Sequence, residues 1–383
     1  MILDIAVLIF CLLLPDTQGA SLKQEIFDSL LVNTSYDKRV SPGSDYGELT
    51  EERSTNVGVQ MYITEIYDVD VAEMDLSISF YLRQKWYDHR LIFNYTNVTS
   101  LQLDHHSIDR VWTPDTYFPE SKDGSFYDIT KPNILMHLFS DGTIIYSMRL
   151  RTKFACTMHF HSYPFDVQQC KINILSYGFA YDRLRYRWYG KDPVIVLHDN
   201  LPLYHTPGRP QSSSQTCHYE DFRDGFLCLE TTIQLRRSIG YYMIELFAPN
   251  ILIVALSWAT FWLHPLAVPG RVSLGVVTFL TISSQGTATR QNAPKVSYVT
   301  AADVWTLFQI MFVFAAMVEF SVVNALARRK KDMTDDNDAD LVEENSDRPF
   351  LEKAKRIDAI SRYTFPGVYL LFNILFWIIA SQI

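Results

Sequence analysis

The chain has 383 residues, of which 48% are hydrophobic and 20% are charged, and its formal net charge is −9. Most charged residues lie in residues 20–240, whereas residues 241–383 consist mainly of apolar runs that are too long for the core helices of a soluble domain. The composition therefore argues against a cytosolic enzyme, and the lack of a basic patch in the polar half argues against nucleic acid as a partner.

The N-terminal segment predicts export from the cytoplasm. Residues 1–14 are apolar except for Asp4, are followed by small residues, and are too few to span a membrane. This pattern is typical of a cleaved signal peptide, which we assign to residues 1–19, with a membrane anchor as the alternative. Three N-glycosylation sequons, at Asn33, Asn94 and Asn97, lie in the polar half and also indicate an exported domain.

The polar half has the sequence pattern of short β-strands. Residues 76–83 and 146–151 both alternate between apolar and polar side chains. A strand with this pattern buries its apolar side chains and exposes the other set, which includes Tyr81, Arg83 and Ser147. Turn residues recur between such runs, so we predict a β-sandwich for this half.

Four cysteines remain after removal of the signal peptide, and an even number in an exported domain indicates disulfide bonds. The pairing that closes two short loops joins Cys156 to Cys170 and Cys217 to Cys228, although four cysteines allow two other pairings. A zinc site is the alternative, but both spacings are longer than those of zinc knuckles.

The apolar half contains four segments close to the roughly 20 residues that a helix needs to cross a membrane. These segments are 241–262, 271–290, 304–326 and 365–380. Basic residues follow the third segment and precede the fourth, so the positive-inside rule places the loop 327–363 in the cytoplasm and both mature termini outside. The end of this loop, residues 350–363, is predicted to be helical and continuous with the fourth segment.

The second segment is the least apolar, because hydroxyl side chains follow one of its helical faces. The predicted pore-lining residues are Pro269, Ser273, Val277, Leu280, Ser284 and Thr287. Hydroxyl groups beside an apolar constriction are typical of a helix that lines a water-filled pore. The alternative is that the hydroxyl groups join helices in a bundle. One helix cannot enclose a pore, so the pore interpretation implies a ring of subunits.

Thirteen residues separate Cys156 from Cys170, and residues 163–166 between them read Tyr-Pro-Phe-Asp. With four apolar segments after it, this loop resembles that of the Cys-loop receptors, the pentameric ligand-gated ion channels. Further matching motifs lie at residues 112–115, 240–242, 269–271, 294–298 and 355–362. The last three resemble the anion-selective branch, which includes glycine receptors and glutamate-gated chloride channels. A second disulfide between Cys217 and Cys228 is also similar to those receptors.

This resemblance implies a β-sandwich extracellular domain, residues 20–240, on a four-helix transmembrane domain, residues 241–383. It implies five homologous subunits, identical or mixed, around a chloride-conducting pore in the plasma membrane, with a postsynaptic location as one option. The number five comes only from the resemblance. No cofactor, metal site or catalytic residue is expected.

The resemblance also assigns an agonist site at the subunit interface. The residues carried over are Tyr81, Arg83, Tyr117, Ser147, Tyr177, Asp221, Phe222 and Phe226. The planar guanidinium of Arg83 would bind a carboxylate, and the aromatic residues would surround an ammonium group. Leu175 stands where relatives often carry a glutamate that faces the ligand amine. A small amino acid is therefore one expected agonist, and a different ligand remains open.

Ion selectivity and gating are assigned in the same way. Cation-selective relatives carry a glutamate where this chain has Pro269 and Gly270, and arginines at the two ends of the segment, Arg271 and Arg290, would favour chloride. Asp166 and Arg237 are predicted to pair where the two domains meet. There they would act with the loop that contains Pro294 and Lys295.

Two other functions remain open from the sequence. The same fold could respond to protons or to a ligand that is not an amino acid, or the chain could be a non-conducting subunit that needs partners. The histidine pairs His105–His106 and His159–His161 are the residues that proton or zinc binding would use. We interpret them as ordinary surface residues.

Overall fold

The computed structural model describes residues 22–43, 54–95, 98–180, 182–198, 201–217, 226–265, 267–292, 295–327 and 348–381. The predicted signal peptide and the predicted site residues Asn97, Asp221, Phe222 and Pro294 lie outside these ranges, and the side chains of Cys217 and Phe226 are not described. The chain forms two compact units. We call residues 1–157, 169–201 and 208–234 the strand unit, and residues 158–168, 202–207 and 235–383 the helical unit.

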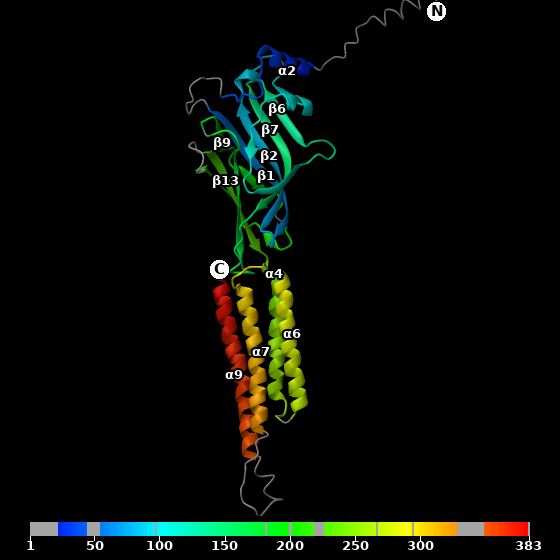
Figure 1. The fold of residues 1–383 in the computed structure, drawn as a ribbon, viewed down its shortest axis with the longest axis vertical. Helices are drawn as coiled ribbons and strands as arrows, with labels where there is room; N and C mark the ends of the chain where they lie inside the picture. Colours follow the sequence, from blue (N-terminus) through cyan, green and yellow to red (C-terminus); the bar gives the residue numbers. More distant parts are fainter. Residues whose placement is uncertain are drawn as a thin grey trace, which may run out of the picture. The chain divides into compact units, whose positions relative to one another are not determined.

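The strand unit contains two β-sheets (Figure 1). The larger sheet has the order β10-β1-β2-β7-β6-β3, with β5 paired to β7 and β9 paired to β1. Its strands are β1 (Thr55–Asp70), β2 (Asp75–Tyr87), β3 (Ser100–Leu103), β5 (Ser121–Phe126), β6 (Ile134–Phe139), β7 (Thr143–Ala155), β9 (Leu184–Trp188) and β10 (Val194–Val196).

The smaller sheet joins β4, β8, β12 and β13, and two short helices complete this unit. Their bounds are β4 (Thr116–Tyr117), β8 (Val167–Ser176), β12 (Gln211–Cys217), β13 (Phe226–Arg237), α2 (Leu22–Asn33) and α3 (His105–Ile108). In the helical unit, β11 (Tyr204–His205) pairs with the end of β13. The predicted β-rich fold of the polar half is therefore present.

The predicted alternation of exposed and buried side chains holds only in part. Arg83 is exposed and Tyr81 is half-buried, but Ser79 is buried in β2 and Ser147 is 9% exposed in β7. The Ser79 hydroxyl donates a hydrogen bond to the Tyr127 hydroxyl at 3.0 Å, so the chain after β5 covers this part of the outer face. The expectation that Ser147 is exposed is therefore wrong.

The helical unit consists of helices that lie side by side (Figure 1). Its elements are α4 (Ile239–Tyr242), the π-helical turn η3 (Met243–Phe247), α5 (Ala248–Ser257), the 3-10 turn η4 (Trp258–Trp262), α6 (Val268–Asn292), α7 (Ala301–Ala327) and α9 (Arg348–Ser381). Val254, Ile282, Val313 and Tyr369, from four different helices, form a buried cluster at the centre.

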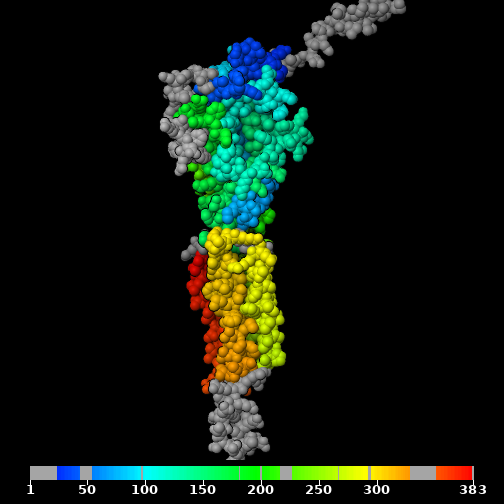
Figure 2. Space-filling view, in the orientation of Figure 1, coloured from blue at the N-terminus to red at the C-terminus, as the bar shows by residue number. Residues whose placement is uncertain are grey.

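Three helices in the described part of the chain are long and apolar enough to cross a membrane: Ile239–Trp262, Ala301–Ala327 and Leu351–Ser381. The second predicted span lies in α6, which has 25 residues but is not among these three, because its many hydroxyl groups make it less apolar. The predicted helix at residues 350–363 is continuous with the last span in α9. On the face shown in Figure 2, α9 (red), α7 (orange) and α6 (yellow-green) lie next to one another.

Candidate functional site

Three of the predicted agonist-site residues, Tyr81, Arg83 and Ser147, occupy neighbouring rows of the larger sheet, and we call them the complementary face. Arg83 in β2 is paired with Ser147 in β7, and Tyr81 lies two residues away on the same face of β2. The guanidinium of Arg83 lies 4.4 Å from the centre of the Tyr62 ring, which is a cation–π distance. The structure therefore brings Tyr81, Arg83 and Ser147 together, with the charged group of Arg83 exposed.

Arg149 belongs to the same face, and the sequence analysis did not select it. In the register of the sheet it pairs with Tyr81, and its guanidinium lies 5.7 Å from the Tyr81 ring centre and 4.2 Å from the Tyr127 ring centre. Its Nε atom is buried and has no hydrogen-bond partner among the described residues. The alternation of residues 146–151 placed Arg149 in the same set as Ser147, which is the signal that could have identified it.

Two other predicted agonist-site residues, Tyr117 and Tyr177, contact each other directly. The rings of Tyr117 and Tyr177 are 5.4 Å apart and nearly perpendicular at 79°, and Tyr177 is 75% exposed. Asp115 holds the loop that carries Tyr177, because its carboxylate accepts hydrogen bonds from the Ser176 hydroxyl at 2.6 Å and from the Gly178 N–H at 2.7 Å. The two tyrosines thus present an exposed aromatic corner, which is suited to a cation or an apolar ligand group.

Leu175 does not line this corner. Its side chain is 3% exposed and packs with Cys228 in the core of the smaller sheet. The backbone of Leu175 pairs with that of Tyr117, so the residue is a neighbour of the corner in the sheet although its side chain is buried. The position at which the resemblance expected a residue facing the ligand is therefore a core position in this chain.

The predicted pore-lining residues lie on one exposed face of α6. All six are exposed, and the largest apolar ones, Val277 and Leu280, are 59% and 61% exposed. The hydroxyl groups of Ser284 and Thr287 donate to carbonyl groups of the same helix, at 2.9 and 3.0 Å. Each hydroxyl oxygen can still accept a hydrogen bond, so this face can be hydrated without an unsatisfied donor.

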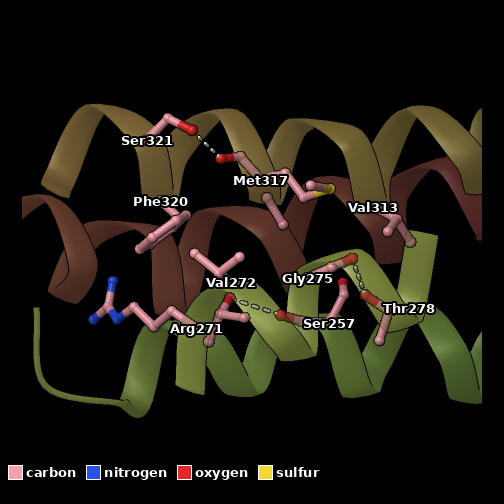
Figure 3. A pocket seen from close by; sticks show the side chains of 11 residues that line it. Ser257, Arg271, Val272, Gly275, Thr278, Val313, Met317, Phe320 and Ser321 are labelled. Atoms are coloured by element: carbon pink, nitrogen blue, oxygen red, sulfur yellow. Dashed lines mark hydrogen bonds between the residues drawn. The ribbon is translucent and has the colours of Figure 1, made fainter. Parts of the chain in front are cut away.

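Arg271 does not lie on this exposed face, and the expectation of a free charge there is wrong. Its side chain is fully buried and forms an ion pair with Asp358 of α9, with a distance of 2.6 Å between Nη2 and Oδ2. It also lines a cavity of about 230 Å³ between α5, α6 and α7, on the side of α6 where Gly275 and Thr278 lie (Figure 3). The charge of Arg271 is therefore compensated within the helical unit.

The other predicted selectivity residues are accessible. Gly270 is exposed at the start of α6. Arg290 is 76% exposed near the end of the helix and forms an ion pair with Asp303 at 3.1 Å. An exposed pair of this kind is weak, so the Arg290 guanidinium remains available to an ion near the end of α6.

Asp166 and Arg237 form the predicted pair, which is buried in the helical unit. The guanidinium of Arg237 makes a bidentate contact with the carboxylate, at 2.7 Å from Nε and 3.0 Å from Nη2. The rings of Tyr163 and Tyr204 lie 4.9 and 4.6 Å from the guanidinium carbon. Burial is the largest single influence and lowers the pKa of Arg237, but the hydrogen bonds and charge of Asp166, together with Tyr204 and Tyr242, give a net rise, so the arginine stays charged. Burial raises the pKa of Tyr163 and of Tyr204, so both hydroxyls stay neutral.

The loop between Cys156 and Cys170, which we call the Cys-loop, also holds the start of α7. The carbonyl oxygens of His161 and Tyr163 accept hydrogen bonds from the N–H groups of Ala301 and Ala302, both at 3.0 Å. These are N–H groups of the first helical turn, which have no partner within the helix. The Phe160 N–H donates to the Tyr298 hydroxyl at 2.9 Å. The Cys-loop is therefore attached to the segment that connects α6 to α7.

The structure confirms one of the two predicted disulfides, and the sequons remain predictions. Cys156 and Cys170 form a disulfide with a Cα–Cα distance of 5.0 Å. Cys228 is also disulfide-bonded, and the side chain of its predicted partner, Cys217, is not described. Asn33 and Asn94 are exposed, as an attached glycan would require. Among the described residues, no group of histidine, cysteine or acidic side chains could hold a metal ion.

Comparison with known families agrees with this arrangement. Residues 23–239 match the model of the neurotransmitter-gated ion-channel ligand-binding domain, and residues 246–341 match that of the neurotransmitter-gated ion-channel transmembrane region. The two matches together cover most of the chain, in the order in which the strands and helices occur. The chain therefore belongs to the neurotransmitter-gated ion-channel family, the Cys-loop receptors, with a β-rich extracellular domain and a helical transmembrane region.

Proposed function

We propose that this chain is a subunit of an agonist-gated anion channel, in which five subunits surround a pore lined by α6. The observation that carries the proposal is the exposed face of α6, which presents hydroxyl groups beside Val277 and Leu280. Neither residue has a polar group to hold water, so a narrow ring of these side chains would exclude water from the closed pore.

The charges of α6 support anion selectivity. The helix contains two arginines and no acidic residue. Because Asp358 compensates Arg271, we assign the attraction of chloride mainly to the exposed Arg290 and to the absence of a carboxylate at Pro269 and Gly270. This assignment differs from the sequence-based one, which gave both arginines the same role.

The charges of the complementary face favour an agonist that carries a carboxylate. Arg83 and Arg149 lie on neighbouring rows of one face, and their row partners Ser147 and Tyr81 are uncharged. A planar guanidinium binds a carboxylate through two hydrogen bonds. The aromatic corner of Tyr117 and Tyr177 from a neighbouring subunit would receive the amine of an amino acid.

Binding would reach the pore through the Cys-loop. Both ends of the loop continue along the chain into the strand unit, and its residues 158–168, which belong to the helical unit, contact the start of α7 and the segment that follows α6. The buried pair of Asp166 and Arg237 would keep the end of β13, which leads into the first span, attached to this loop. The basic residues of the loop 327–363 support a cytoplasmic position for that loop and external positions for both mature termini.

The test is to express this chain alone and to apply amino acids, biogenic amines and acidic solution under voltage clamp. We expect a current in response to a carboxylate-bearing amino acid. A current only with amines or protons would contradict the proposed ligand class. Labelled protein at the cell surface without any current would indicate a subunit that requires partners.

A further inference from the structure

The Cys-loop carries a histidine whose ring stacks on a tyrosine of the segment between α6 and α7. The ring centres of His161 and Tyr298 are 4.0 Å apart, and the ring planes differ by only 21°. His161 is exposed, and neither of its ring nitrogens has a hydrogen-bond partner within the described residues. The ring can therefore accept a proton without breaking a hydrogen bond.

This stack lies beside the backbone contacts that attach the Cys-loop to the same segment. The carbonyl oxygen of His161 accepts the N–H of Ala301, and the neighbouring Phe160 donates its N–H to the hydroxyl of Tyr298. These two hydrogen bonds do not depend on the charge of an imidazole. The strength of the ring stack depends on this charge, because an imidazolium over the face of a tyrosine ring gains a cation–π interaction that a neutral imidazole lacks.

The charged groups on the elements that meet here are mostly compensated. On the Cys-loop and the end of β13, Asp166 and Arg237 pair with each other. At the ends of α6 and α7, Arg290 and Asp303 pair with each other. The other ionisable groups on these elements are His159 and Tyr163 on the Cys-loop, the exposed Arg236 at the end of β13, and Lys295 on the segment that carries Tyr298. The charge of Lys295 opposes a positive charge on His161, whereas the π face of Tyr298 favours that charge.

We propose that His161 and Tyr298 form a proton-binding site, at which acidification strengthens the attachment of residues 295–300 to the Cys-loop. Histidine is the side chain that most often serves as a pH sensor in proteins. The attached segment continues directly from α6, the predicted pore-lining helix. A proton bound here stabilises the arrangement in which residues 295–300 contact the Cys-loop. It therefore favours whichever channel state contains this contact.

The direct test measures the thermal stability of the full-length protein in detergent at pH 7.5 and pH 5.5. The cation–π interaction exists only for the protonated ring, so its stabilisation is present at low pH and lost as the pH rises. The comparison variant is His161→Phe, which keeps an aromatic stack but cannot be protonated, and the matched control is His159→Gln in the same loop. Tyr298→Leu removes the other half of the site.

On going from pH 7.5 to pH 5.5, the wild type should become more stable relative to His161→Phe. The expected gain corresponds to an approximately two- to fivefold increase in the folding equilibrium constant per subunit. His159→Gln should retain this gain, and Tyr298→Leu should lose it. Equal pH dependence of the wild type and His161→Phe would overturn the proposal, as would loss of the gain in His159→Gln. If His161→Phe yields no folded protein, His161→Gln replaces it with the same expected and contrary outcomes. No agonist is needed, so a wrong ligand assignment would not affect this result.

Discussion

Replacement of Arg237 by alanine should prevent the chain from reaching the cell surface. Arg237 and Asp166 are both almost fully buried, and the guanidinium makes two hydrogen bonds to the carboxylate. Without Arg237, the carboxylate keeps a hydrogen bond from the Gln168 amide at 2.5 Å but has no compensating charge in the buried pair. Removal of one partner from a buried ion pair costs about 3–5 kcal/mol. Since a folded domain is stable by only about 5–15 kcal/mol, this cost is a large part of the total.

The assay is surface labelling combined with the melting temperature of the detergent-solubilised protein. Arg237→Lys keeps the charge but not the planar fork, so it should lie between the wild type and Arg237→Ala. The matched control is Arg290→Ala, which breaks an exposed ion pair and should cost less than about 1 kcal/mol. Normal surface level and an unchanged melting temperature for Arg237→Ala would refute the reasoning that this pair holds the Cys-loop to β13.

Four further predictions concern separate parts of the chain. Leu280→Ser should wet the constriction and give leak current or higher agonist sensitivity under voltage clamp, and unchanged gating in a well-expressed variant would contradict the register of α6. Arg83→Ala should raise the half-maximal concentration of a carboxylate agonist by about one to two decades, because it removes a charge-assisted hydrogen bond. The control Gln60→Ala, in the same row of the sheet, should change this concentration little. Equal dose–response curves for the wild type and Arg83→Ala would contradict the proposed site. Cys156→Ser should leave the protein inside the cell, and normal surface labelling would show that the disulfide is dispensable. Burial, followed by the charge of Asp88, raises the pKa of Tyr36, so the stability that its neutral hydroxyl contributes is present below about pH 10 and is lost as the pH rises further. The melting temperature of the wild type should therefore fall more steeply above pH 10 than that of Tyr36→Phe. Parallel curves for the two proteins would contradict this prediction.

Features that depend on local spacing were predictable from the sequence. The exposed face of α6 follows from helical periodicity, because residues three or four apart share a face. The disulfide between Cys156 and Cys170 follows from its short loop, and the meeting of Arg83 with Ser147 is consistent with the alternation of β2 and β7. In each of these cases, the pattern itself contains the geometric information.

Features that depend on distant partners were not predictable in this way. Arg271 is buried because Asp358, 87 residues further along the chain, pairs with it. A charge at the end of a helix gives no signal that such a partner exists. Ser147 is buried although its strand alternates correctly, because alternation gives the face of a strand but not what covers that face. The alternation of β7 placed Arg149 on the face of Ser147, but its contacts with Tyr81 and Tyr127, which lie outside β7, could not be predicted from that pattern.

The proposed anion pore is tested most directly by the reversal potential of the current through this chain at two external chloride concentrations. The channel can be opened by an agonist found in the screen or by the substitution Leu280→Ser. If chloride carries the current, a tenfold reduction in external chloride should shift the reversal potential by about 59 mV in the positive direction, and replacement of external sodium should leave it unchanged. A reversal potential that follows sodium and ignores chloride would contradict the assignment of α6 as the wall of an anion-selective pore.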